Sequence, residues 1–548
     1  MNNLIIKNGI VFDPLNGIEG EVKDILIEDG KIVESISNKK DVKEINASGK
    51  TVIPAAIDIH AHIASQQVNW ARLLGKNNEI FQKVWKGLTL ENIAKDYISN
   101  GYTMIVEANV FPSLTKQTIF NFNNLPVLDK AMLLNVSNLW SLELEYQRGK
   151  IDDMAIFLSD LLEKTKGFGF KVYNPFESED WDFKVLRDDL SKQGRLYNFN
   201  ALDVYENISK SNEELGLPHS VHAHVEGYED PQGNINLLKI LEKIKSLNLK
   251  NPDNRSQIFH LAHASSYNIN GDNSNLIKFF NDNQNFDLDL GILGFNEINP
   301  IISSDRRLIN SLIKSKNPHK LIRSAIEFEG DLFSSIRKFD KNNEKDCNLW
   351  ANAIDLVLNI KNKYQIQASI NFPNYANITD IPKIATLFVS SEARNNFIKR
   401  MNVDFLNKTT LKDNDKTITF NELIIITRAS PAKSLGLRKV KGNLDIGVDG
   451  DVNILNFNAL ELDLNKDYEI LKEKLKNIEY VIKEGEIIKH QDHIIFNNIG
   501  KIFWSSGKSQ KKDNELVLSK KKEFYKKYSS IFYDSFKITI NSKLLKKI

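Results

Sequence analysis

The chain has 548 residues, 41% of them hydrophobic and 26% charged, and its net charge of +2 gives no reason to expect nucleic acid or a membrane surface as a partner. Its length allows a barrel-sized domain together with a second module. The single cysteine, Cys347, excludes an internal disulfide and an iron–sulfur cluster held by four thiolates of this chain.

The N-terminal residues lack the long apolar region of a signal peptide. No stretch of the sequence approaches the roughly 18 apolar residues of a membrane-spanning helix. We therefore expect a cytoplasmic protein.

Short strands with tight turns are predicted at both ends of the chain. Strands are expected at residues 4–9 and 24–33, where Asn8-Gly9 and Asp29-Gly30 are strong turn dipeptides. A similar pattern returns at 447–456 and 481–488. We expect residues 1–52 and 437–500 to form one small β-sandwich-like module from both termini.

The middle of the chain, residues 53–436, alternates apolar strands with helical stretches. This alternation predicts a parallel α/β fold, and the length fits a (β/α)8-type barrel. In such barrels the chemistry gathers at the C-terminal ends of the strands. Strands are expected at 103–107, 170–173, 220–224, 257–263 and 366–370, and helices at 89–99 and 154–166.

His60 and His62 stand at the end of an apolar run that begins at Thr51. Side chains two residues apart on a strand point to the same side, so these two imidazoles can grip one metal ion. The alternative is a hydrogen-bonded pair of histidines at a strand end, and an isolated H-x-H motif does not decide between the two.

Further candidate ligands follow along the barrel region. Lys171 lies in an apolar strand, where a lysine is costly unless its charge is paired or removed. It fits either a buried salt bridge or a carboxylated lysine that bridges two metals. His222 and His224 form a second H-x-H, and His263 lies at another strand end. Imidazole and oxygen ligands favour zinc, and two such ions would generate a hydroxide and polarise a carbonyl.

The order H-x-H, lysine, histidine, histidine resembles the amidohydrolase superfamily of metal-dependent barrels. A narrower resemblance is to the A subunits of formylmethanofuran dehydrogenase and of the bacterial formyltransferase/hydrolase complex. The segments that carry it are long and follow the same order: 8–17, 58–63 with 68–72, 101–103, 165–175, 217–224 with 231–234, and 426–436.

The resemblance implies a dinuclear zinc site. His60 and His62 would bind one ion, carboxylated Lys171 would bridge, and His224 and His263 would bind the second. It also implies a substrate, an N-formyl group on a methanofuran-like amine carrier, which is hydrolysed to formate. Other subunits of the complex would load the formyl group or perform the redox step, which agrees with the lack of cysteines.

The most serious departure from the family pattern concerns one residue. Asn371 stands where the family places an aspartate that binds metal and relays the proton, and it is the candidate catalytic position here. An amide cannot accept that proton at neutral pH, and losing a general acid or base costs roughly 10²–10⁴ in rate. Asp380, a carboxylate nine residues further on, is a candidate to replace the missing aspartate, but the sequence gives no geometric argument for that role. Two alternatives therefore remain: a structural or carrier-binding subunit that has lost catalysis, and a hydantoinase- or dihydroorotase-like enzyme for another amide.

Residues 501–548 form a Lys-rich C-terminal extension, with 13 lysines against four acids and aromatic residues interleaved. A charge run is usually a solvated face, so we expect a surface helix packed on its own domain. The alternative is a basic face that meets an acidic partner or cofactor.

Overall fold

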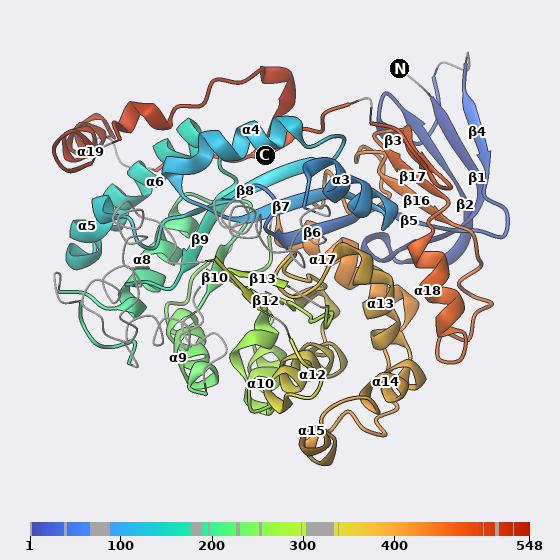
Figure 1. Cartoon of the computed structure of the whole chain (residues 1–548). Coiled ribbons are helices and arrows are strands. Elements are labelled where there is room, and N and C mark those ends of the chain that lie inside the picture. Colours follow the sequence, from blue (N-terminus) through green and yellow to red (C-terminus); the bar gives the residue numbers. More distant parts are fainter. Residues whose placement is uncertain are drawn as a thin grey trace.

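The structure is a computed structural model that describes residues 3–37, 41–65, 88–176, 189–194, 198–225, 231–250, 255–296, 299–302, 334–337, 339–496, 498–509, 514–529 and 531–548. Segment 68–72, which carries part of the resemblance, lies outside these ranges. In Figure 1 a barrel occupies the centre, a β module lies at its right, and the C-terminal segment runs along the top.

Eight parallel strands form the barrel that the sequence predicts, and this prediction is confirmed. In chain order they are β6 (Ala56–Ala61), β7 (Tyr102–Val110), β8 (Asp129–Asn135), β9 (Gly169–Tyr173), β10 (Val221–His224), β11 (Phe259–Leu261), β12 (Phe286–Asp289) and β15 (Ile366–Gln367). A bridge between Ala61 and Phe372 joins the first strand to the chain after the last one, and the His62 N–H donates to the Phe372 carbonyl at 2.7 Å.

Helices surround the barrel. The helix expected at 89–99 is α3 (Leu90–Ser99), which Thr89 caps by accepting the Asn92 N–H. The helix expected at 154–166 begins earlier, as α6 (Ile151–Thr165). The others include α4 (Thr115–Asn124), α5 (Glu143–Arg148), α8 (Ala201–Glu214), α9 (Gly233–Ser246), α10 (Ser274–Asp282), α12 (Glu344–Asn359), α13 (Ile381–Val389), α14 (Ser391–Ile398), α15 (Val403–Lys408), α16 (Phe420–Ile424) and α17 (Ser430–Ser434). A separate antiparallel pair is formed by β13 (Asn299–Ile302) and β14 (Ser334–Arg337).

The β module unites strands from both ends of the chain, as predicted. Its N-terminal strands are β1 (Leu4–Asp13), β2 (Ile18–Glu28), β3 (Lys31–Val33), β4 (Lys43–Asn46) and β5 (Thr51–Pro54). The C-terminal ones are β16 (Val452–Leu455), β17 (Tyr480–Lys483), β18 (Glu486–His490) and β19 (His493–Ile494), with α18 (Tyr468–Lys476) between β16 and β17. Antiparallel pairing of β5 with β16 joins the two halves. The residue boundaries between this module and the barrel stay predictions.

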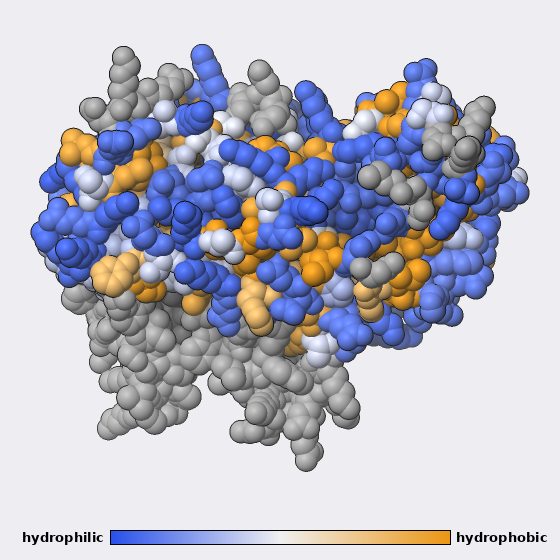
Figure 2. Space-filling view, turned by 90° about the horizontal axis from the view of Figure 1, so that it is seen from above, coloured by the Kyte–Doolittle hydropathy of each residue, from blue (hydrophilic) through white to orange (hydrophobic). Residues whose placement is uncertain are grey.

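The segment after residue 500 adds to the barrel sheet. β20 (Ile502–Trp504) pairs in parallel with the start of β8, and β21 (Leu545–Lys547) pairs with β20. The helix α19 (Asn514–Tyr528) buries Tyr525, while its Lys521 ammonium lies 2.6 Å from the Glu145 carboxylate. The molecular face in Figure 2 is mostly hydrophilic with interspersed hydrophobic patches. Within the described part of the chain, no helix is long and apolar enough to cross a membrane.

Candidate metal centre

Seven buried histidines converge inside the barrel. The strand register makes ladder neighbours of Lys171, His222, His260 and Asp287 on β9 to β12, so their side chains share one face of the sheet. That face is the barrel interior, because His222 Nε2 lies 3.0 Å from Nδ1 of His60 on β6, across the barrel. None of the seven is more than 5% exposed: His60, His62, His219, His222, His224, His260 and His263.

The first predicted ligand pair is held by two carboxylates. His60 Nδ1 lies 2.9 Å from Asp289 Oδ2, and His62 Nδ1 lies 3.2 Å from Glu107 Oε1. A carboxylate only accepts hydrogen bonds, so Nδ1 carries the proton in both rings and Nε2 keeps its lone pair. Carboxylates hold metal-ligating histidines in this way. The other Glu107 oxygen accepts three backbone N–H groups, which fixes the loop after His62: those of Ile63, Ala64 and Ser65.

The second predicted pair faces each other directly. His224 Nδ1 lies 2.8 Å from His263 Nε2, and His263 Nδ1 lies 3.1 Å from the Ser266 hydroxyl. The His263 backbone is left-handed, with φ of 34°, and its N–H donates to Asp289 Oδ1 at 2.9 Å. The ring centroids of His60 and His263 are 5.2 Å apart, so the two pairs adjoin each other.

Lys171 completes the predicted set, buried with 1% exposure. Burial lowers the pKa of His60 to about 3, although Asp289 opposes that shift, and the charge of Lys171 lowers it further. Burial likewise holds the pKa of His224 and His263 well below the usual range, again with Lys171 contributing. These imidazoles are therefore neutral, which is the form that ligates metal ions.

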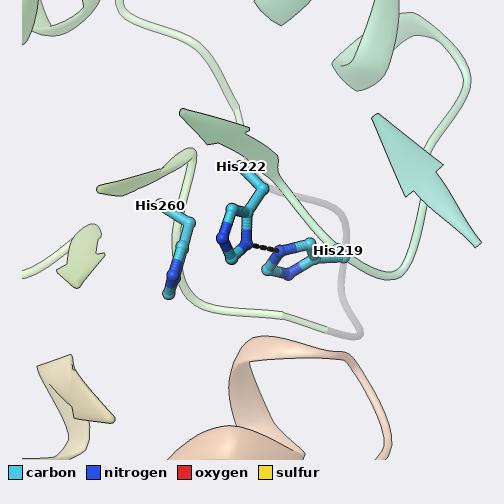
Figure 3. A group of neighbouring side chains, drawn as sticks. All are labelled: His219, His222 and His260. Carbon is cyan, nitrogen blue, oxygen red and sulfur yellow. Dashed lines mark hydrogen bonds between the residues drawn. The ribbon is translucent and has the colours of Figure 1, made fainter. Parts of the chain in front are cut away.

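A further histidine cluster is formed by His219, His222 and His260 (Figure 3). The rings of His222 and His260 stack with centroids 4.2 Å apart. Each His260 nitrogen faces a carboxylate, Asp287 at 2.9 Å and Asp289 at 3.1 Å. Burial alone would lower the pKa of His260, but these two carboxylates outweigh it and raise the pKa to about 9. Both nitrogens of His260 therefore donate.

Asn371 follows β15, and the next residue, Phe372, forms a bridge with Ala61 of β6. The Asn371 N–H donates to the Ser369 hydroxyl at 3.0 Å, which in turn donates to the His60 carbonyl at 3.1 Å. The Asn371 side-chain oxygen accepts from Asn374 at 3.1 Å. Asp380 is used elsewhere, since its carboxylate accepts from the Asn377 N–H and from the Asn296 amide.

Three carboxylates of the site were not predicted from the sequence: Glu107, Asp287 and Asp289. The signal for the last two was the alternation of apolar and acidic residues in 286–290, typical of a strand with both acids on one face. Burial would raise the pKa of Asp289, but His60 and His260 outweigh it and hold that pKa well below its usual range. Asp289 is thus an ionised acceptor rather than a proton-accepting base.

Ligand atoms in the histidine groups lie close enough together to hold a metal ion, notably those of His60, His222 and Asp289. The model for the amidohydrolase family matches residues 373–489. This match and the barrel fold confirm the predicted resemblance to the amidohydrolase superfamily.

The relatives agree with the narrower resemblance. The chain is 28% identical over 514 residues to the protein FwdA of Methanocaldococcus jannaschii, covering 88% of this chain and 89% of that relative. It is 24% identical over 506 residues to the A subunit of the formyltransferase/hydrolase complex Fhc of Methylorubrum extorquens, with 88% and 89% covered. The crystal structure of the M. extorquens complex FhcABCD with methylofuran shares the fold, with a TM-score of 0.83, 21% identity, and 100% and 99% of the two chains covered.

Proposed function

We propose that this chain is the hydrolytic subunit of a multi-subunit complex of one-carbon metabolism. It hydrolyses an N-formyl amide on a methanofuran-like carrier and releases formate. The observation that carries the proposal is the pairing of His60 with His62 and of His224 with His263 around Lys171. The similarity to FwdA and to the A subunit of Fhc over 88% of the chain supports the substrate class and the partner subunits.

The donor set fits two divalent metal ions such as zinc. His60 and His62 would hold one ion through Nε2, because Nδ1 of each ring faces a carboxylate and carries the ring proton. His224 and His263 would hold the other through Nδ1 and Nε2, the two nitrogens that face each other. Lys171 would bridge as a carbamate, which turns its buried cation into an anionic oxygen donor. The bound ions would supply a hydroxide at neutral pH and polarise the formyl carbonyl.

The amine that leaves the formyl group needs a proton, and neither Asn371 nor Asp289 is suited to supply it. Asn371 donates and accepts hydrogen bonds but has no proton to relay. Asp289 is committed to His60, His260 and the His263 N–H. This observation favours a second candidate function, a carrier-binding subunit without catalysis of its own. The other amidohydrolase alternative is less supported, since the dihydroorotase of Aquifex aeolicus matches 22% of this chain.

The test is formate release from a formylated methanofuran-type carrier by the purified complex, with its zinc content measured on the same sample. We expect two zinc ions per chain and formate release above that of a complex stripped by chelation. A zinc-loaded complex that binds the carrier and releases no formate would contradict the hydrolase and support the carrier-binding subunit.

A further inference from the structure

We propose that His219 and His222 are positioning residues of the metal centre. Together they form a buried chain of hydrogen bonds that runs from the Ser434 carbonyl to His60 and fixes the His60 ring in the tautomer whose Nε2 can bind a metal ion. This inference rests on the metal site of the proposed function, and it assigns a purpose to two histidines that are not among the proposed ligands.

The chain begins at a helix end. Ser434 is the last residue of α17, where the final carbonyls of a helix lack partners within it. The Ser434 carbonyl accepts from His219 Nδ1 at 2.8 Å and also from the Gln257 side-chain amide. A carbonyl has no proton to give, so Nδ1 of His219 carries one, and Nε2 of the neutral ring is an acceptor.

The donor–acceptor order that begins at the Ser434 carbonyl determines which nitrogen carries the proton in each following ring. His219 Nε2 lies 3.2 Å from His222 Nδ1, so His222 donates there (Figure 3). Its Nε2 is then an acceptor, 3.0 Å from His60 Nδ1. His60 therefore carries its proton on Nδ1, where Asp289 Oδ2 also accepts at 2.9 Å. The nitrogen left with a lone pair is His60 Nε2.

Asp289 Oδ2 lies 3.6 Å from His222 Nε2, too far for the hydrogen bond that would reverse this order of donors. His60, His219 and His222 are at most 1% exposed, so bulk water offers their nitrogens no alternative partners. His260 stacks on His222 but directs both of its N–H groups at Asp287 and Asp289. It therefore does not compete for the acceptor nitrogen of His222.

A glycine after α17 allows the Ser434 carbonyl to lie close to His219. Gly436 has φ of +66°, and a Cβ there would lie 2.6 Å from the Pro218 carbonyl oxygen. Only glycine lets the end of α17 approach residues 217–219 so closely. Segments 217–224 and 426–436 both carry the family resemblance, and the Ser434–His219 hydrogen bond connects them.

Three variants of the full chain in its complex test the proposal. His219→Leu removes the link, whereas His219→Gln keeps one acceptor and one donor. Gln257→Leu is the matched control, because it deletes the other donor to the same carbonyl without touching the chain. The measurements are zinc affinity, by competition with a chelator, and the visible spectrum of the cobalt-substituted complex.

We expect His219→Leu to lose affinity at one of two zinc sites by roughly 10–100-fold, the usual loss when a partner of a metal-ligating histidine is removed. Its cobalt spectrum should change. His219→Gln and Gln257→Leu should both stay within about threefold of wild type on either measurement. If His219→Leu does not fold, His219→Met replaces it.

Wild-type affinity and spectrum in His219→Leu or its substitute would overturn the inference. So would an equal loss in Gln257→Leu, which would make the effect one of packing, and so would a wild type that binds no metal. A wild type with two metals and no formate release would contradict the proposed function alone, since the zinc and cobalt measurements do not depend on turnover.

Discussion

At the proposed metal centre, the side chains that would hold the metals differ from Asn371, the residue at the position proposed for proton transfer. The four proposed imidazole ligands have their nitrogens placed by carboxylates or by each other. The side-chain oxygen of Asn371, at the position proposed for the proton relay, instead accepts a hydrogen bond from the Asn374 amide. Placement of the ligands and transfer of the proton therefore depend on different side chains, which can be varied separately.

Asn371→Asp should raise kcat for formate release by roughly 10²–10⁴, because a carboxylate can take the proton of the attacking water and return it to the amine. The measurement is the rate of formate release from one formylated carrier at saturating concentrations of carrier and zinc. Asn374→Asp is the control, since it introduces the same charge three residues away. A rate that is already high in wild type and falls in Asn371→Asp would show that proton transfer does not pass through this position.

Glu107→Gln should weaken zinc binding by roughly 10–100-fold at the site that contains His62. The glutamine retains an acceptor, but it lacks the charge that holds the Nδ1 proton of His62 and three backbone N–H groups. Chelator competition measures the loss. Glu145→Gln, which removes a carboxylate paired with Lys521, should leave zinc affinity unchanged. Equal losses in both variants would count against a specific effect on His62.

The sequence allowed the proposed histidine ligands and Lys171 to be predicted because each lies within or at the end of an apolar run. It did not reveal that His60 meets Asp289, since that contact depends on which strands face each other across the barrel. Periodicity places a side chain on a face of its own strand and carries no information about the register of distant strands. The metal-ligand assignment itself stays a prediction.

At the scale of elements, strand positions were predicted better than strand lengths. The apolar run 257–263 contains β11 over Phe259–Leu261 alone, because the chain turns out of the sheet at His263, where φ is 34°. The strands β8, β12 and β20 were not expected. The last of these follows from a long-range pairing with β8, to which local propensity makes no contribution.

Gly500→Ala tests this pairing. A Cβ at Gly500 would lie 2.0 Å from the Leu128 carbonyl oxygen, so β20 could not keep its place beside β8. We expect the free energy of unfolding to fall by about 1–3 kcal/mol or more, as for other overpacked sites. Urea denaturation measures it. Gly169→Ala is the control, with its nearest neighbour, a Leu133 methyl, at 3.4 Å. Equal stability of the two variants would mean that β20 is not held against β8.

At the scale of the whole molecule, a buried ion network joins the barrel to the β module. Lys441 Nζ lies 2.9 Å from Asp129 on β8, 3.2 Å from Asp449 and 2.6 Å from Asp451, all at most 3% exposed. Lys483 on β17 adds a contact of 3.1 Å to Asp129. The sequence predicted a module built from both termini, but ion pairs between residues more than 300 apart have no local signature.

Lys441→Met should lower the free energy of unfolding by about 3–5 kcal/mol at pH 7, because it leaves buried carboxylates without their cation. Urea denaturation measures the loss. Lys408→Met, which breaks the exposed pair with Glu344, is the control and should cost less than about 1 kcal/mol. A loss as small as that of the control would show that the network does not hold the two modules together.

Wild type and Lys441→Met should also differ in how the free energy of unfolding depends on pH. Burial would raise the pKa of Asp129 and Asp449, but Lys441 outweighs it and holds both below the usual range. A carboxyl with a lowered pKa in the folded state stabilises the fold above its unfolded pKa of about 3.9, and that contribution is lost as the pH falls further. In Lys441→Met the desolvated carboxyls lack this cation and bind protons more readily when folded.

The difference in unfolding free energy between wild type and Lys441→Met should therefore be largest near pH 7 and shrink as the pH is lowered toward 4. A difference that stays constant or grows on acidification would mean that Lys441 does not set the ionisation of these carboxyls.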